Sequence, residues 1–460
     1  MPIEMSHARL SGVSRGYQRE GADGRGSFYL VLAYLLVDFG RPQDLIPGLN
    51  MLALGAVVTV FLGISLARSG RLEFLDKQTV LFMGLLVLML IHIPLARNTF
   101  YSFNTAKLMF FTFISYMSII TFVNSAQKVF VMMRFWIFVH LALAIVGIFK
   151  GGVGVGGWVE DENDLCMELN VALAFSAFMA FSATSMKSKL LYLGLSGIFV
   201  LTIMATLSRG GFIGLVAVGG YCWLRSSKKF VSAVVVCVLV LVMSVFAPEK
   251  YWSEVQSITS EEETQTGTGG ERLYTWGIGW EMFLANPIIG IGQGNFPWEF
   301  LHYEAGRTFR GHSLSGRLAH SLYLTLLPEL GLIGGGIFVA MTCYILLNCA
   351  AIHRAYKRSA GGEGVSRLRD ATLVALGIEG ALLGYLITSV FISTLYYPTF
   401  WTLMAFSLVI RKVFINSSDN LEGDSTGLSK AEFASARRRL FGASGPRAAP
   451  LRRSSPPGRL

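Results

Sequence analysis

The sequence predicts an all-α membrane protein, a polytopic bundle whose helices cross a bilayer many times. Three observations lead to this fold class. Apolar residues make up 53% of the 460 positions and charged residues only 15%, and the mean hydropathy of +0.53 exceeds what a soluble domain of this size shows. Stretches without Asp, Glu, Lys or Arg recur at the length that spans a bilayer, and Gly380–Ile410 is long enough to cross twice. The charged residues gather between these stretches.

The apolar stretches place about twelve membrane spans in chain order. They lie at 27–46, 49–66, 78–96, 107–123, 129–149, 165–185, 190–207, 210–224, 230–247, 319–349, 371–395 and 398–413. The chain therefore divides into an N-terminal segment (1–26), nine spans (27–247), one large extramembrane loop (248–318), three spans (319–413) and a tail (414–460). We expect the tail to be disordered because it is rich in Ser, Gly, Pro and Arg.

The distribution of positive charge predicts the orientation. Short loops rich in Lys and Arg stay in the cytoplasm. With the N-terminus inside, the inside segments hold 28 of the 39 basic residues and the outside segments hold ten, while Arg134 falls within a span. We therefore expect both termini to be cytoplasmic, and the large loop and the acidic loop 157–168 to face outward. The first apolar stretch contains Asp38 and lacks a cleavage site, so no removable signal peptide is expected.

Several other classes of site are disfavoured. The net charge of +10 does not indicate nucleic-acid binding, because the basic residues lie between apolar stretches and in the tail. His302, His312 and His320 match no zinc spacing, and the five cysteines form no metal motif, so no metal is expected. The glycine-rich segment 290–296 lacks the strand and crossover of a dinucleotide fold, so no nucleotide or other cofactor is expected. The glycines indicate a tight turn after Pro287.

Arg209 is the first candidate for chemistry, because it separates two uncharged stretches at membrane depth. A guanidinium there is costly unless an anion or a cluster of acceptors meets it. Gly210 and Gly211 would allow a ligand or a backbone to approach closely. The alternative is an arginine that reaches the outer interface or forms a structural ion pair.

Arg272 opens an amphipathic segment of the outer loop. Apolar residues recur there at helical spacing, at Leu273, Trp276, Trp280 and Phe283. An arginine at a helix start suits a phosphate. The alternative is an interfacial arginine beside tryptophan anchors.

His320 stands at the start of the tenth predicted span, after the basic residues Arg307, Arg310 and Arg317. Alone it indicates only a polar group at a helix end. The acidic run 161–164 could bind a cation, but Asn163 or Asp164 as the N-cap of the next helix explains it more simply.

Four segments together resemble a known family. They are "NDLCMELNVAL" (163–173), "SRGG" (208–211), "ERLYTWGIGWEMFLANPIIGIGQGNF" (271–296) and "HSLYLTLLPELGLIG" (320–334). Their order around one large outer loop is similar to the O-antigen ligase and O-antigen polymerase superfamily, bacterial inner-membrane enzymes that transfer glycans from undecaprenyl pyrophosphate on the periplasmic face. The likeness covers roughly 155–340, and Ser321 departs from it because many members have asparagine there.

The resemblance implies roles for particular residues. Arg209 and Arg272 would hold the donor pyrophosphate, and His320 would act on the acceptor hydroxyl. We expect Arg317, Tyr323 and Asn163 to complete the substrate-binding set. The implied reaction needs no metal, because pyrophosphate is already a good leaving group and two arginines can neutralise its charge.

The sequence leaves the exact reaction open. The resemblance favours a ligase that passes a glycan from undecaprenyl pyrophosphate to lipid A-core or another glycan acceptor, in lipopolysaccharide biosynthesis. A polymerase that joins lipid-linked repeat units is the alternative. A transporter or flippase of lipid-linked sugars would also have many spans, although it would usually show two related halves. A scaffold would not need Arg209 at membrane depth.

Overall fold

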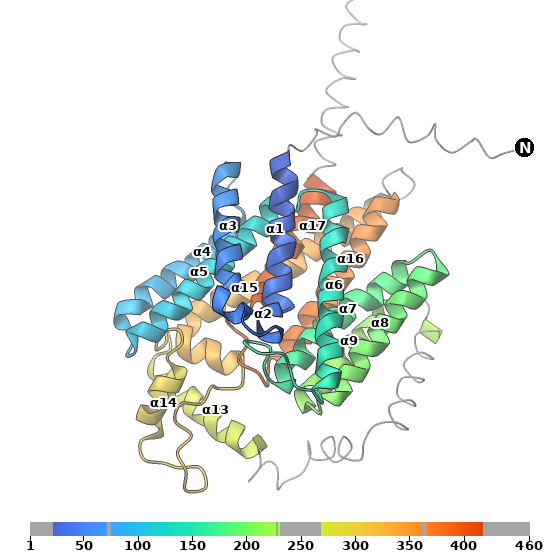
Figure 1. Cartoon of the computed structure of the whole chain (residues 1–460). Helices are drawn as coiled ribbons and strands as arrows, with labels where there is room; N and C mark the ends of the chain where they lie inside the picture. Colours follow the sequence, from blue (N-terminus) through green and yellow to red (C-terminus); the bar gives the residue numbers. More distant parts are fainter. Residues whose placement is uncertain (1–21, 71–74, 227–228, 231–267, 360–364, 417–460) are drawn as a thin grey trace, which may run out of the picture. The chain divides into compact units, whose positions relative to one another are not determined.

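The computed structural model describes residues 22–70, 75–226, 229–230, 268–359 and 365–416, and every regular element in these ranges is a helix. Nine described helical segments are long and apolar enough to cross a membrane. They are Leu49–Ser69 (with α3, Leu54–Ser69), α4 (Lys77–Leu95), α5 (Thr99–Phe122), α6 (Ala126–Phe149), α7 (Glu162–Ser182), α8 (Met186–Ala205), α15 (Tyr323–Arg358), α16 (Val365–Thr388) and Pro398–Ile415 (with α17, Pro398–Arg411). The all-α membrane fold is thus confirmed (Figure 1).

The count of twelve spans is not established. Helices α1 (Ala22–Phe39) and α9 (Arg209–Arg225) coincide with predicted spans, but α1 carries three charged residues and α9 has only 17 residues. The span predicted at 230–247 lies outside the described residues except for its first position, as do most of 1–26 and 414–460 and the first part of the large loop. The orientation of the termini stays a prediction.

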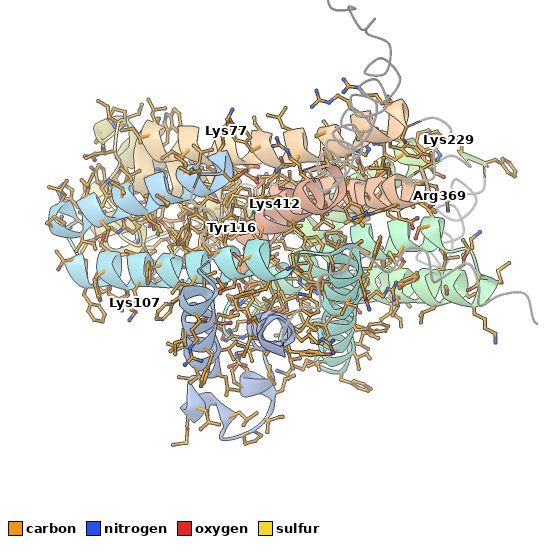
Figure 2. All side chains as sticks on the ribbon, turned by 90° about the horizontal axis from the view of Figure 1, so that it is seen from above. Lys77, Lys107, Tyr116, Lys229, Arg369 and Lys412 are labelled. Atoms are coloured by element: carbon orange, nitrogen blue, oxygen red, sulfur yellow. The ribbon has the colours of Figure 1, made fainter. Side chains whose placement is uncertain are left out.

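Helix α7 lies at the centre of the described bundle. It packs against α6, α8, α9 and α16, and most of its side chains are buried. Side chains fill the space between the helices, as Figure 2 shows around Tyr116, whose hydroxyl lies 3.2 Å from that of Thr79. Because α7 begins at Glu162, most of the acidic segment 157–168 forms the first turns of this buried helix rather than a loop.

A polar group inside the bundle holds α7 to two other helices. Glu168 of α7 is fully buried, and its Oε2 lies 2.9 Å from Nε2 of His140 on α6. The Thr399 hydroxyl on α17 donates to the other carboxylate oxygen, and the second ring nitrogen of His140 lies 2.8 Å from the Trp136 carbonyl oxygen. A buried charged group is costly unless each polar atom has a partner, and here the partners are present.

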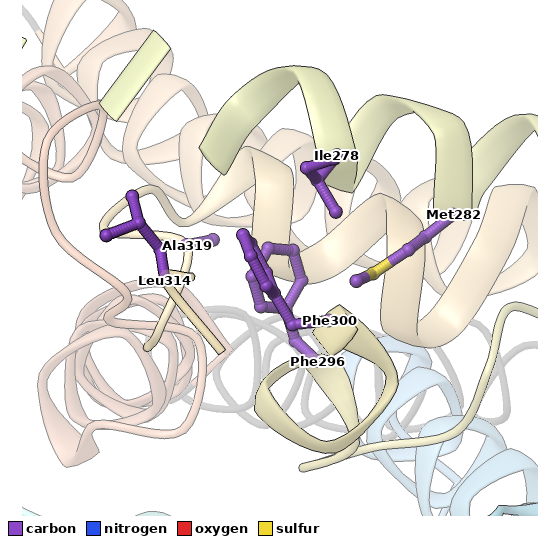
Figure 3. Packing of buried hydrophobic residues seen from close by; sticks show 6 residues of the cluster. All are labelled: Ile278, Met282, Phe296, Phe300, Leu314 and Ala319. Carbon is purple, nitrogen blue, oxygen red and sulfur yellow. The ribbon is translucent and has the colours of Figure 1, made fainter. Parts of the chain in front are cut away.

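Two helices of the large loop pack as a small unit against α15. They are α13 (Thr268–Ala285) and α14 (Phe296–Glu304), drawn in yellow in Figure 1. Their buried contact consists of Ile278, Met282, Phe296, Phe300, Leu314 and Ala319 (Figure 3). Because Leu314 and Ala319 belong to the segment just before His320, this cluster attaches that segment to α13 and α14. The described part of this segment is thus helical at α13 and α14, and its place in one large periplasmic loop stays a prediction.

Helix α15 is broken about two turns inside its start. Gly331 has φ 61° and ψ −163°, a conformation open only to glycine, and Pro328 lies just before it. Residues 287–292 form hydrogen bonds with the backbone groups that lose their helical partners at the break. The nitrogens of Ile291 and Gly292 donate to the carbonyls of Pro328 and Glu329, and those of Leu332 and Ile333 donate to Pro287 and Ile288.

The Glu329 carboxylate fixes the remainder of this glycine-rich loop. It accepts hydrogen bonds from the backbone nitrogens of Gly294 (2.8 Å) and Phe296 (3.0 Å), and from the Tyr396 hydroxyl (2.5 Å). The tight turn predicted after Pro287 is confirmed. Its glycines bring the backbone to a buried carboxylate, and Gly290, Gly292 and Gly294 all have positive φ.

Replacing Gly331 should destabilise the protein. In Gly331→Ala the new Cβ would overlap the Ile288 carbonyl oxygen, and the backbone conformation is strained for any other residue. We expect a loss of about 1–3 kcal/mol, seen as a lower apparent melting temperature in detergent. Gly336→Ala is the matched control, because a Cβ added to this helical glycine of α15 would have open space around it and should be neutral or slightly stabilising. Equal melting temperatures for the two variants would contradict the assigned break.

Candidate active site

The candidate site lies where α7, α9, α13 and α15 begin. The Ser208 hydroxyl accepts a hydrogen bond from the Gly211 nitrogen (3.0 Å) as the N-cap of α9, and it donates to Oδ1 of Asn163 in the first turn of α7 (2.7 Å). The N-cap of α7 is Asp161, whose Oδ1 accepts from the nitrogens of Asn163 and Asp164. The expectation that Asn163 or Asp164 would be the cap was therefore wrong, because the helix begins earlier, at Glu162.

Arg209 is the first residue of α9, and its Nη2 donates to the Thr268 hydroxyl at the start of α13 (3.3 Å). The preceding Leu207 has φ 55°, which turns the chain from α8 into α9 within three residues. The two glycines after Arg209 permit close packing, as expected. A Cβ at Gly211 would clash with Cys166, and one at Gly210 would lie 3.0 Å from the Phe391 side chain.

Arg272 lies in the first turns of α13, on the same side of the bundle as Arg209. Its guanidinium carbon is 6.0 Å from the centre of the Phe391 ring, within the range of a cation–π contact. The Trp276 ring lies 6.4 Å from the same ring, and its Nε1 donates to the Ala319 carbonyl (2.9 Å). Phe391 therefore contacts the beginnings of both α9 and α13.

His320 lies in the turn before α15, and the helix itself begins at Tyr323. The predicted span began at 319, four residues too early, because the backbone of His320 is left-handed with φ 47°. The nitrogen of the nearby Leu322 donates to the Ser389 carbonyl (2.8 Å), which ties this turn to the end of α16. A positive φ is uncommon for a residue other than glycine, and such conformations cluster at functional sites.

Burial lowers the pKa of His320 below its ordinary value, and the positive charge of Arg272 lowers it further. Asp161 raises the pKa, Arg317 lowers it and Glu271 raises it, each by less than burial does. These groups must therefore lie close to the imidazole. Because the net effect is a lower pKa, the ring is neutral near pH 7 and has a nitrogen that can accept a proton.

The other predicted binding residues contact protein groups. Arg317 forms an ion pair with Glu271, Asn163 accepts from Ser208, and the Tyr323 hydroxyl donates to the Leu386 carbonyl (2.9 Å). Among the residues that the structure covers, no group of three His, Cys, Asp or Glu side chains is placed to hold a metal ion.

The segment 389–397 is a part of the site that the sequence analysis missed. The predicted spans 371–395 and 398–413 left almost no room for it, but α16 ends at Thr388 and α17 begins at Pro398. The nine residues between them supply Phe391, as well as Tyr396 for Glu329 and Tyr397 for Asp164. Two signals could have indicated this break, namely Pro398, which disfavours helix in the residue before it, and the polar run "STLYY".

A comparison of the sequence with models of known protein families gives one match. A family model described as O-antigen ligase matches residues 194–339. Over these residues the chain is similar to the O-antigen ligase family. The match includes Arg209, Arg272 and His320, so the resemblance seen in the sequence is confirmed at the level of the family. The family indicates a glycosyl-transferring membrane enzyme of the O-antigen ligase or polymerase type. A search of curated proteins found no significant match to this chain.

The charges around His320 give a test that does not depend on substrate. Arg272→Gln removes a positive charge and should raise the pKa of His320, whereas Asp161→Asn removes a negative charge and should lower it. The pH dependence of diethyl pyrocarbonate labelling, followed by mass spectrometry of the His320 peptide, reports this pKa. Arg307→Gln is the control, because Arg307 pairs with Glu281 instead. Identical titration curves for the Arg272 and Asp161 variants would show that these groups do not face His320.

Proposed function

We propose that this enzyme moves a glycan from undecaprenyl pyrophosphate to an acceptor hydroxyl on the periplasmic side of the bacterial inner membrane, as an O-antigen ligase acting on lipid A-core. The observation that carries the proposal is that Arg272 acts on the pKa of His320 from the start of α13, where Thr268 accepts a hydrogen bond from Arg209. The periplasmic side follows from the positive charge of the opposite loops.

Arg209 and Arg272 would bind the donor's pyrophosphate. In the reaction the bond between the sugar's anomeric carbon and the phosphate oxygen breaks, and negative charge grows on that oxygen. Guanidinium groups bind phosphate through paired N–H donors, and prepositioned donors stabilise growing charge without reorganisation. Arg209 also stands at the first turn of α9, where the helix dipole favours an anion.

His320 would act as the general base. The acceptor hydroxyl gives its proton to the neutral imidazole while its oxygen forms the new bond to the anomeric carbon. Undecaprenyl pyrophosphate leaves with the electron pair of the broken bond. A direct displacement of this kind inverts the configuration at that carbon. The lowered pKa of His320 suits this role, because it keeps the base unprotonated under neutral conditions.

The membrane-spanning helices would hold the site at a depth that the polyprenyl-linked donor can reach from the bilayer. The polyprenyl chain must stay in the bilayer while its pyrophosphate reaches the site. Apolar side chains are exposed along α13 and in the following loop, including Leu273, Trp280, Leu284 and Ile288. A surface of this composition suits the membrane interface, which would bring the site to the depth of lipid phosphates.

Reconstitution with a lipid-linked glycan tests the proposal. Arg209→Ala, Arg272→Ala and His320→Ala should each lower kcat about 100-fold or more, the usual effect of removing an oxyanion donor or a general base. Arg307→Ala is the matched control, because this exposed arginine of the same loop pairs with Glu281 and should leave transfer near the level of the unaltered protein.

The choice of acceptor separates the candidate reactions. Transfer to purified lipid A-core supports the ligase, whereas products that grow by whole repeat units in the absence of lipid A-core indicate a polymerase. Movement of the lipid-linked glycan across vesicles without any transfer would indicate a transporter. Full transfer by all three alanine variants would disprove the proposed site.

A further inference from the structure

An ion pair between Arg317 and Glu271 joins two parts of the proposed site. Nη1 of Arg317 donates to Oε2 of Glu271, and the two side chains are 49% and 34% exposed. Glu271 directly precedes Arg272 in the first turn of α13, and Arg317 lies three residues before His320. The pair therefore joins the residue next to the proposed phosphate-binding arginine to the segment just before the proposed base.

Electrostatics supports this location independently of the chain order. Both members of the pair influence the titration of His320, in opposite directions, together with Arg272 and Asp161. A second pair joins Glu281 of α13 to Arg307, which follows α14, and it is not among the main groups that act on His320. Within residues 268–318, the part of the loop that the structure describes, two arginine–glutamate pairs join α13 to later residues, and the Arg317–Glu271 pair is the one that acts on His320.

We propose that Glu271 and the donor's pyrophosphate compete for the guanidinium of Arg317, so that Glu271 weakens the binding of both the donor and the pyrophosphate product. This inference rests on the proposed function. A carboxylate and a phosphate bind a guanidinium through the same fork of N–H donors, so one can replace the other without moving the arginine far. An exposed ion pair contributes about 0–1 kcal/mol, so its exchange costs little.

The pyrophosphate gains negative charge in the reaction, so the competition for Arg317 affects release of the product. The donor's pyrophosphate is esterified at both ends, whereas the product is esterified only by the polyprenyl chain and therefore carries one more ionisable oxygen. Three arginines at the site would hold that product more tightly than the donor. The carboxylate of Glu271 returns to Arg317 as the pyrophosphate leaves, which favours release of the product.

Glu271→Gln tests the inference, because it keeps the size and hydrogen-bonding capacity of the side chain and removes only its charge. We expect the KM for undecaprenyl-pyrophosphate-linked glycan to fall about two- to fivefold, the equivalent of losing one exposed ion pair. Inhibition by added undecaprenyl pyrophosphate and by inorganic pyrophosphate should strengthen by a similar factor. Arg317→Gln should act in the opposite direction and raise the KM.

Glu281→Gln is the matched control, because it removes the carboxylate of the second exposed pair and should leave the KM and both inhibition constants unchanged. An unchanged or higher KM in Glu271→Gln would overturn the inference, since a structural pair would bind the donor less well once broken. Equal effects of Glu271→Gln and Glu281→Gln would overturn it as well, because they would reflect only the overall charge of the loop. The proposed function fails separately, if Arg272→Ala and His320→Ala keep full transfer.

Discussion

The arrangement of this protein depends on the break in α15 and on the buried carboxylate that completes it. Backbone groups at membrane depth need internal partners, so a helix can open there only where another segment supplies hydrogen bonds. The glycine-rich loop 287–296 does this for the break at Gly331, and Glu329 in turn accepts two of the loop's nitrogens. The side chain of Gln293 extends the attachment by donating to the carbonyls of Met89 and Ser102. The large loop is thereby anchored to α4, α5 and α15 together.

This anchor determines how the candidate site is assembled. With the loop held at residues 287–296, α13 packs beside α15, and the buried cluster around Phe296 and Phe300 attaches the segment before His320. On the other side, α7 is held by the Glu168–His140 pair and presents Asn163 to the start of α9. The candidate residues thus belong to separate segments, which buried polar contacts fix at α7 and a buried apolar cluster fixes at α13.

Composition and charge were sufficient to predict the fold class and most helices. Arg209 could be found because a guanidinium between two uncharged stretches is costly, and Arg272 because it opens an amphipathic segment. His320 gained a role only from the family resemblance. Helix ends were predicted less well. The run from Gly380 to Ile410 is uncharged throughout, so hydropathy could not reveal that 389–397 leaves the helix to contact the site.

Pairings between distant residues could not be predicted at all. Glu271 and Arg317 are 46 residues apart, and Phe391 lies 119 positions beyond Arg272, with no periodicity that relates them. Such contacts arise from tertiary packing of the loop on the bundle. Glu329 lies within an apolar stretch, where a carboxylate is costly, and only the structure gives its partners, two backbone nitrogens and a tyrosine hydroxyl.

The central claim is that one pyrophosphate site lies where α9, α13 and α15 begin. Cryo-electron microscopy of the protein in lipid nanodiscs with undecaprenyl pyrophosphate tests it most directly. The account predicts phosphate density within hydrogen-bonding distance of both Arg209 and Arg272, with His320 beside it. Phosphate density near the opposite ends of α9 and α15, where Arg225 and His353 meet Glu379, would contradict the account.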